Sequence, residues 1–266
     1  MKSFKLMGIL NITPDSFFDG GRFFDRSKAV DHALQMERDG AYIIDIGGES
    51  TRPGSSPVSN DEEIERCIPV IEEIRKHSSV KISIDTQKSE VALSAICAGA
   101  NMINDVSGGR TDPKILNVAA EHDVEICLMH MRGTPKSMQA NTHYDNLIDE
   151  IEEYFKERIE CAKKNGIKTD KIILDPGIGF GKDAKDNIKL LDGIPIWLKN
   201  KAPLLIGLSN KSFINNLLGH QLEERLEATL ATIGLAYRNG ATIFRVHDVA
   251  STRRFLEMES KLTSFT

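Results

Sequence analysis

Short apolar runs alternate with longer amphipathic segments along this chain. Residues 40–54 show the pattern: Gly-Ala, an apolar run over residues 42–44, then Asp45, Ile46, two glycines and a polar loop with one arginine. A run rich in strand formers and without polar alternation predicts a strand that is buried on both faces. Residues 99–106 and 240–247 repeat this order. Three such copies indicate repeating βα units.

Over the whole chain, this pattern predicts eight strand–helix units. The expected strands cover residues 6–11, 42–46, 80–85, 102–104, 125–129, 172–174, 204–208 and 243–246. The expected helices cover residues 27–39, 60–77, 89–98, 113–122, 145–165, 185–198, 212–218 with 223–239, and 249–260. Eight units without a second compositional zone predict a single (β/α)8 TIM barrel over residues 1–266. The alternative is an open doubly wound sheet, which the count of eight disfavours.

Composition and charge narrow the class of protein. Hydrophobic residues make up 40% and charged residues 27%, as in a globular protein. A formal net charge of −5 argues against a general nucleic-acid binder. We expect no signal peptide and no membrane span, and therefore a cytoplasmic location, because no long apolar segment occurs. The four cysteines form no C-x-x-C and no zinc spacing, which predicts reduced thiols.

Polar side chains stand where the predicted strands end. These positions are Asn11, Asp45, Asp85, Asn104, Met129, Asp175, Lys211, and Arg245 with His247. A TIM barrel gathers the C-terminal ends of its strands on one face, where the active sites of this fold lie. One or two of these residues could be caps or salt-bridge partners, but the whole set predicts a functional site.

The strand-end residues suggest two kinds of ligand group. Asp85, Asn104 and Asp175 suit a flat heterocycle with several N–H donors, because a carboxylate makes charge-assisted hydrogen bonds to such an edge. An anion such as a phosphate would suit Arg52, Arg245 and His247 together with helix N-termini. Hard oxygen ligands for Mg²⁺ shared with phosphates are available on Asn11 and on the aspartates of the loop that follows it.

Two other segments allow more than one interpretation. The glycines of residues 175–182 fit neither a G-x-G-x-x-G motif nor a P-loop, and we expect them to let the backbone approach a planar ring. Phe180 could pack on that ring or be a core aromatic residue. Lys211 could be a Schiff-base nucleophile, a charge partner of the ligand or a structural ion pair. His130 is more typical of a satisfied buried histidine than of a catalyst.

The loop after the first strand is long and carries aromatic residues. We predict that it is a mobile functional lid, since phenylalanines serve little purpose on an idle loop. Its predicted lid residues are Thr13, Asp15, Ser16, Phe17, Phe18 and Asp19.

Eight motifs together resemble the dihydropteroate synthase family of folate biosynthesis, from Met7 to about Val249. They are residues 11–21, 45–54, 83–88, 103–109, 128–132, 175–182, 209–212 and 245–249. The resemblance implies condensation of 6-hydroxymethyl-7,8-dihydropterin diphosphate with 4-aminobenzoate, giving 7,8-dihydropteroate and diphosphate, with Mg²⁺. The family is a sulfonamide target, and its members are commonly homodimers, for which Leu226, Leu230 and Leu235 could form an interface or equally be core.

The resemblance also implies roles for single residues. The pterin contacts are expected at Asp85, Asn104, Met129, Asp175, Phe180, Gly207 and Lys211. Diphosphate is expected at Asn11, Arg52, Arg245 and His247, with Asn11 also the Mg²⁺ ligand, and 4-aminobenzoate at Thr51, Arg52, Pro53 and Ser212. The expected catalytic set is Asp85, Asp175, Lys211 and Arg245. We expect an ionising mechanism in which a pterin-CH₂ cation forms between the acids and the arylamine attacks it.

Three residues depart from the family pattern, and three other functions compete. Phe18 stands where Ser is usual, Asn210 where Arg is usual, and Ala228 where Gly is common. A pterin-binding methyltransferase acting on methyltetrahydrofolate would share the acids but would not need the diphosphate site. A Schiff-base aldolase would need Lys211 as nucleophile. A catalytically silent pterin-binding protein would not need the whole set.

Overall fold

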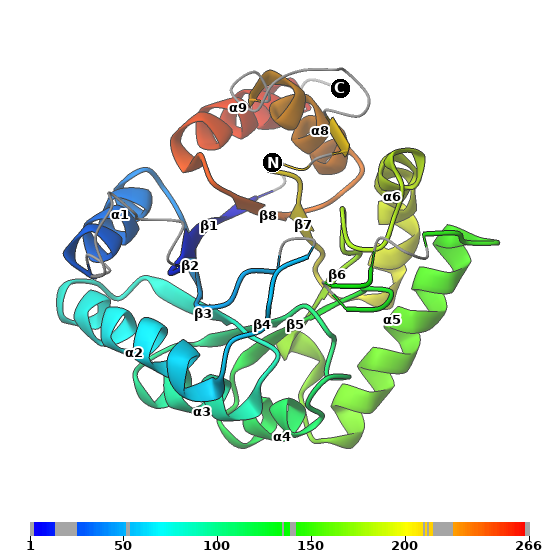
Figure 1. Cartoon of the computed structure of the whole chain (residues 1–266). Helices are drawn as coiled ribbons and strands as arrows, with labels where there is room; N and C mark the ends of the chain where they lie inside the picture. Colours follow the sequence, from blue (N-terminus) through cyan, green and yellow to red (C-terminus); the bar gives the residue numbers. More distant parts are fainter. Residues whose placement is uncertain are drawn as a thin grey trace.

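The computed structural model describes residues 3–13, 26–51, 54–134, 136–138, 142–209, 211, 213–214 and 226–263. Eight parallel strands lie at the centre of this described part, and helices surround them (Figure 1). The strands are β1 (Lys5–Asn11), β2 (Ile43–Gly47), β3 (Lys81–Asp85), β4 (Met102–Asp105), β5 (Glu125–Met129), β6 (Ile172–Asp175), β7 (Leu205–Gly207) and β8 (Ile243–Val246). The helices are α1 (Arg26–Arg38), α2 (Asn60–His77), α3 (Ser89–Cys97), α4 (Lys114–Glu121), α5 (Leu147–Lys164), α6 (Ala184–Trp197), α8 (Leu226–Arg238) and α9 (Val249–Leu262).

The sheet closes into a barrel. Its strand order is β6-β5-β4-β3-β2-β1-β8-β7, and a parallel bridge between Leu174 and Leu204 joins the two ends. The backbone N–H of Leu174 also donates to the carbonyl of Pro203 at 3.0 Å. The predicted TIM barrel is therefore confirmed, and the alternative of an open doubly wound sheet is wrong.

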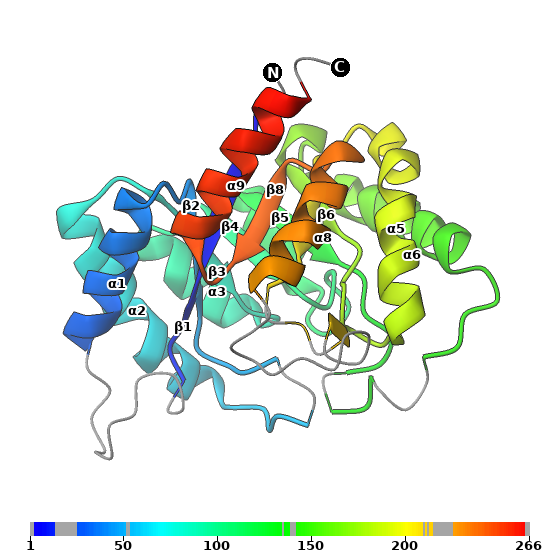
Figure 2. The same cartoon turned by 90° about the horizontal axis from the view of Figure 1, so that it is seen from above.

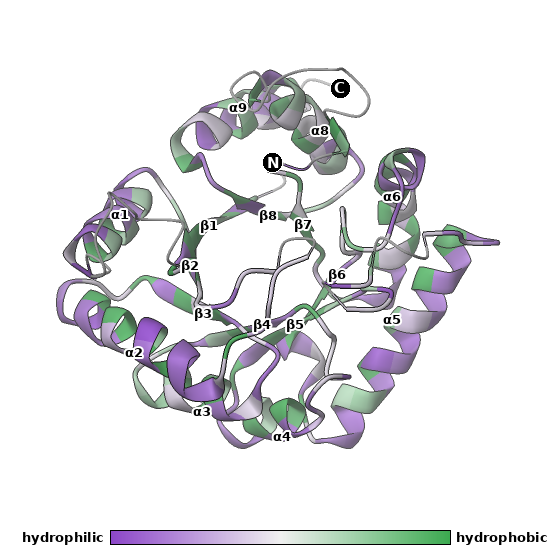
Figure 3. Ribbon diagram, in the orientation of Figure 1, coloured by the Kyte–Doolittle hydropathy of each residue, from purple (hydrophilic) through white to green (hydrophobic). Residues whose placement is uncertain are grey.

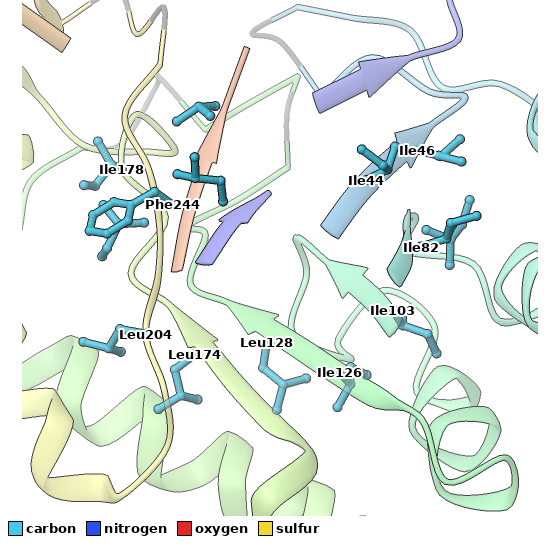
Figure 4. Close-up of a cluster of buried hydrophobic side chains, with 14 of the residues drawn as sticks. Ile44, Ile46, Ile82, Ile103, Ile126, Leu128, Leu174, Ile178, Leu204 and Phe244 are labelled. Atoms are coloured by element: carbon cyan, nitrogen blue, oxygen red, sulfur yellow. The ribbon is translucent and has the colours of Figure 1, made fainter. Parts of the chain in front are cut away.

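Two apolar layers follow from the two-residue alternation of the strands. One set of side chains points outward from the strands and packs under the helices. Figure 4 shows members of this set on five strands: Ile44, Ile82, Ile103, Leu128 and Leu174. The other set points inward and fills the part of the barrel near the amino ends of the strands: Met7, Ile43, Met102, Cys127, Ile173, Leu205 and Ile243.

The helices are amphipathic, and α2, α6 and α9 begin with a side-chain cap. Ser59 precedes α2, where its hydroxyl accepts from the N–H of Glu62, and three acidic residues follow in the first turn. Hydrophilic and hydrophobic residues alternate along α5 in Figure 3, as expected for a helix with one face on the barrel. Two short 3₁₀ turns, Thr169–Lys171 and Leu198–Asn200, were not predicted.

The second strand begins one residue later than predicted. Tyr42 lies just before β2 and is 50% exposed, with the Lys5 ammonium 4.7 Å from its ring centroid. An aromatic residue next to an apolar run suggests strand, but this one lies where the barrel opens to solvent at the amino ends of the strands. Figure 2 shows that α9 ends on this side, while the loops that follow the strands gather on the opposite side.

Candidate active site

Strand alternation brings the polar strand ends to the mouth of the barrel. The side chain two residues after an interior apolar residue faces the same side of the strand. On five of the seven strands that have such an interior residue, the residue two positions later is Asp45, Asn104, Met129, Asp175 or Arg245. Asp85 ends β3 and is paired in register with Asn104 and Gly47. The predicted gathering of these side chains is confirmed.

Arg245 joins two buried carboxylates. Its Nε donates to Asp45 Oδ2 at 2.6 Å, and its Nη2 donates to Asp85 Oδ2 at 2.7 Å. Asn104 Nδ2 donates to the same oxygen of Asp45 at 3.0 Å. Asp45 is fully buried and Asp85 is 5% exposed. Four side chains from four strands therefore form one hydrogen-bonded network across the barrel.

This network places charged groups in a mostly buried site. Burial raises the pKa of Asp85 to about 7, against the lowering effect of Arg245. Burial alone would lower the pKa of Arg245, but Asp45 and Asp85 outweigh it and raise that pKa. Within the described residues, the Oδ1 atoms of both aspartates lack a hydrogen-bond partner. Buried polar atoms of this kind normally have a partner, so they mark a place for ligand donors.

Asp175 forms a second acidic position. Its Oδ1 accepts from the backbone N–H of Gly177 at 2.7 Å, and the residue is 6% exposed. Burial raises the pKa of this carboxyl to about 6, although the Gly177 N–H and Lys211 lower it. Gly177 has φ +69°, and a Cβ there would lie 1.9 Å from the carbonyl oxygen of His130. Only glycine fits this turn.

Lys211 lies over an aromatic face. Its Nζ is 4.3 Å from the ring centroid of Phe180, which packs against the cluster that contains Met129. Burial first, and then Arg245, lower the pKa of Lys211 to about 8. A cation over a ring face is a stabilising contact that fixes both side chains. The interpretation of Phe180 as purely core is therefore less favoured than a place in the site.

Three further predicted residues line the mouth. A Cβ on Gly47 would lie 3.8 Å from Asn11 Oδ1 and 3.7 Å from Asp85 Oδ2, so these two oxygens face a common space. A Cβ on Gly207 would meet nothing within 4 Å, which leaves room for a flat ring. The ring of His247 shares a hydrogen bond between Nδ1 and Ser209 Oγ at 3.0 Å.

The loop between β2 and α2 is fixed by a lysine that is partly buried, with 20% of its side chain exposed. Lys88 Nζ donates to Glu49 Oε2 at 2.6 Å, to Glu63 Oε2 at 2.7 Å and to the carbonyl of Val58 at 2.8 Å. Glu63 is 1% exposed, and burial raises its pKa in spite of Lys88. Thr51 lines a small cavity together with Asp85 and these groups. One of the residues predicted for 4-aminobenzoate is thus close to the acidic network.

Several predicted residues lie outside the described part of the chain. They are Arg52, Pro53 and Ser212, the lid residues Asp15, Ser16, Phe17, Phe18 and Asp19, and the departing residue Asn210. Thr13 is described and is half-buried. Their roles stay predictions. His130 is buried and hydrogen-bonded, in agreement with its interpretation as a satisfied histidine.

Three residues of the site carried no predicted role. Asp45 was noted as a strand end, but its bonds to Arg245 and Asn104 span 200 and 59 residues of sequence. Its place two residues after the interior Ile43 is the signal that could have assigned it. Lys88 and Lys182 were part of recognised motifs, yet nothing in the sequence shows that both are hydrogen-bonded within the loops or that Lys182 is buried.

The described residues lack two kinds of feature, a membrane-spanning helix and a protein-only metal site. No described helix is long and apolar enough to cross a membrane. No group of three or more histidine, cysteine, aspartate or glutamate side chains in the described ranges could hold a metal ion. A cation at this site would therefore need amide, water or substrate oxygens among its ligands.

The barrel fold with acidic side chains at its mouth is shared with a known class of enzymes. Residues 7–247 match the family of pterin binding enzymes. The dihydropteroate synthase of Synechocystis sp. is 47% identical over 258 residues, which cover 97% of this chain and 89% of that protein. The chain belongs to this pterin-binding family and, within it, to the dihydropteroate synthases, transferases of folate synthesis.

Solved structures give the same result. A crystal structure of Yersinia pestis dihydropteroate synthase with a sulfonamide drug is 41% identical, with a TM-score of 0.92 over 99% of this chain and 95% of that one. The Xanthomonas albilineans enzyme in complex with 7,8-dihydropteroate is 38% identical, with a TM-score of 0.88 over 98% of this chain and 94% of that one. The predicted family is confirmed.

Proposed function

We propose that the chain condenses 6-hydroxymethyl-7,8-dihydropterin diphosphate with 4-aminobenzoate at the barrel mouth. The observation that carries this proposal is the set of buried carboxylates on β2, β3 and β6, two of which have an oxygen without a partner among the described residues. The pterin edge carries N–H donors that match Asp85, Asn104 and Asp175. Its ring fits the open space at Gly207, with Met129 and Phe180 as apolar neighbours.

The reaction starts with ionisation of the C–O bond to diphosphate. The bonding electrons leave with the diphosphate, and the methylene carbon becomes a cation that is delocalised into the pterin ring. Asp85 and Asp175 favour this positive charge electrostatically in a site that is largely closed to water. The amino nitrogen of 4-aminobenzoate then forms the new C–N bond and loses one proton to water. No covalent enzyme intermediate is needed.

The leaving group requires positive charge at the rim. Arg245 uses two of its N–H groups on Asp45 and Asp85, and a guanidinium has five, so it can also donate to a diphosphate oxygen. His247 lies two residues after it in the chain, in the segment that leads to α9. Arg52 and the lid residues complete this half of the site in the proposal.

The residues present could hold Mg²⁺ only together with oxygens of the substrate diphosphate and of water. Asn11 Oδ1 is a hard oxygen that faces the space beside Gly47 and Asp85, and it would hold the ion together with diphosphate and water oxygens. When bound, Mg²⁺ would neutralise charge on the leaving group.

The proposed reaction is tested by mass spectrometry. The purified chain is mixed with dihydropterin diphosphate, 4-aminobenzoate and Mg²⁺, with and without EDTA. We expect dihydropteroate and diphosphate in equal amounts, and loss of both with EDTA. Product that is insensitive to EDTA would remove the metal from the proposal. Pterin binding without product would favour a methyltransferase or a silent binding protein, and trapping by borohydride at Lys211 would indicate an aldolase.

We also infer that the enzyme is a cytoplasmic homodimer. Leu226 and Leu235 of α8 and Met258 and Leu262 of α9 are 38%, 41%, 56% and 47% exposed, respectively. The two helices pack on each other through Phe255 against Gly234, and through the ion pair between Arg238 and Glu259. Exposed apolar residues on neighbouring helices suit a second copy of the chain. The four free cysteines suit a reducing compartment.

A further inference from the structure

A lysine outside the predicted site is completely enclosed by hydrogen-bond acceptors. Lys182 is 3% exposed, and its Nζ lies 2.9 Å from His130 Nδ1, 3.2 Å from the carbonyl of His130, 2.9 Å from that of Gly177 and 3.0 Å from that of Phe180. An ammonium offers three N–H donors, whereas a neutral amine offers two. The carbonyl oxygens of His130, Gly177 and Phe180 can only accept, and only the ammonium has three N–H donors for them, so these contacts favour the charged form although burial lowers the pKa of Lys182 to about 7.

His130 is arranged to accept from this lysine. Because Nδ1 faces an ammonium, the ring is neutral and carries its proton on Nε2. Burial, followed by the charge of Lys182, lowers the pKa of His130 well below its ordinary range. The ring meets Tyr154 edge to face at 4.8 Å between centroids, and the backbone N–H of His130 donates to the carbonyl of Asp175 at 2.8 Å. The imidazole is thus a fixed part of the wall.

The turn after β6 is arranged around the Lys182 ammonium. Gly177, Gly179 and Gly181 have φ values of +69°, +85° and +66°, so the chain reverses sharply around Lys182. The carbonyls of Gly177 and Phe180 converge on its Nζ, together with the carbonyl of His130 from the loop after β5. Converging carbonyl dipoles repel each other in a buried site unless a positive charge lies between them.

The same turn carries two of the proposed pterin contacts. Its first residue is Asp175, whose Oδ1 accepts from the Gly177 N–H. Phe180, near its other end, places its ring under the Lys211 ammonium. We propose that Lys182 is a positioning residue for the pterin half of the site, because its ammonium ties the loops after β5 and β6 together and thereby sets Asp175 and Phe180 against the ring. This inference rests on the proposed function.

The test separates positioning from simple stabilisation by comparing the two substrates. Lys182→Met keeps the apolar stem and removes the charge. We expect the KM for dihydropterin diphosphate to rise about 10- to 100-fold, since a displacement of about 1 Å in a site has effects of this size. The KM for 4-aminobenzoate should stay unchanged. Calorimetry with 6-hydroxymethyl-7,8-dihydropterin should show the same loss of affinity without any catalysis.

Two further variants make the outcome decisive. Lys182→Ala should regain pterin affinity when propylammonium, which replaces the missing carbons and charge, is added. The matched control is Lys189→Met, since Lys189 lies on α6 with a side chain that is 63% exposed, and it should behave as the wild type. Equal changes for both substrates, or unchanged pterin affinity in a folded Lys182→Met, would overturn the inference.

A variant that does not fold can be distinguished experimentally from an error in the proposed function. If Lys182→Met does not fold, His130→Gln serves instead, because it disturbs one acceptor and leaves the three carbonyls in place. It should weaken pterin binding in the same direction but less, and an effect on 4-aminobenzoate alone would contradict the inference. Wild-type protein that makes no dihydropteroate would overturn the proposed function. The calorimetric comparison of pterin affinities would still decide the role of Lys182.

Discussion

The acids of the site are placed for binding at the expense of stability. Asp175 has an ordinary pKa of 3.8, and burial raises it to about 6 in the folded protein. Between these values the folded state keeps a proton that the unfolded chain has lost, so the free energy of unfolding falls as pH rises through this window. A shift of about two units corresponds to about 3 kcal/mol at neutral pH. A bound pterin would offset this cost by supplying hydrogen-bond donors.

Asp175→Asn should therefore separate stability from function. The amide can still accept from the Gly177 N–H but carries no charge, so we expect the free energy of unfolding at pH 8 to rise by about 1–3 kcal/mol. Pterin affinity should fall at least about 100-fold, because a charge-assisted pair of hydrogen bonds is lost. Urea denaturation and calorimetry measure the two effects. A variant with wild-type affinity would show that Asp175 does not bind the pterin.

The pH dependence of binding gives an independent check on the same residue. In the wild type, pterin affinity should weaken as pH falls, first near pH 7 as Asp85 becomes protonated and then near pH 6 as Asp175 becomes protonated. The Asp175→Asn variant should lose the component of this dependence near pH 6. An identical profile in both proteins would assign the titration to another group.

Arg245 and Asp45 should behave as a pair. Arg245→Gln leaves two buried carboxylates without their cation, and removing one partner of a buried ion pair costs about 3–5 kcal/mol. The double variant Arg245→Gln with Asp45→Asn removes one of the uncompensated charges and should recover part of this loss. A double-mutant cycle by urea denaturation measures the coupling. Purely additive effects would mean that the two side chains do not interact in solution.

At the scale of elements, the strands were predictable but the loops that carry the site were not. Continuous apolar runs identify strands buried on both faces, which is why each of the eight predicted strands agrees with an observed strand to within one residue at either end. Loop geometry depends on buried polar contacts between distant residues, such as Lys88 with Glu63 and Lys182 with His130, which are separated by 25 and 52 residues. Apolar periodicity carries no information about such pairs.

Lys88 should control the β2–α2 loop. Lys88→Met leaves Glu63 buried without its cation and frees Glu49 and the Val58 carbonyl, so we expect a loss of about 3–5 kcal/mol in the free energy of unfolding. The KM for 4-aminobenzoate should rise more than that for dihydropterin diphosphate, because Thr51 lies on this loop. Steady-state kinetics, at a temperature where circular dichroism shows the variant to be folded, measure both constants.

Two variants control the Lys88 experiment. Lys76→Met removes an exposed lysine of α2, with a side chain that is 65% exposed, and should leave stability and both KM values unchanged. Glu63→Gln in the Lys88→Met background removes the uncompensated charge and should recover stability. If that double variant is as unstable as Lys88→Met alone, the buried carboxylate is not the cause of the loss.

At the scale of the whole molecule, closure of the barrel makes the site possible. Arg245 on β8 reaches Asp45 on β2 and Asp85 on β3 across β1, which lies between them. This contact exists only when the strands curve around a common interior, since the three side chains must all face the axis. The count of eight strand–helix units predicted that the barrel closes. Which side chains Arg245 meets across the barrel, however, depends on the register and shear of the strands. Register could not be obtained from the apolar pattern alone.

The proposed homodimer should depend on the apolar surface of α8 and α9 and not on the site. Leu235→Glu with Met258→Glu places two charges on this surface without disturbing the buried face of either helix, since both side chains are exposed. We expect the wild type to sediment as a dimer and the variant as a monomer. Pterin affinity should be retained, because the described site residues come from one chain.

Leu93→Glu on α3, whose leucine is 40% exposed, is the matched control and should remain dimeric. A wild type that sediments as a monomer at all concentrations would exclude this interface. Exposed apolar residues drive association only where together they form one contiguous surface that a partner can cover.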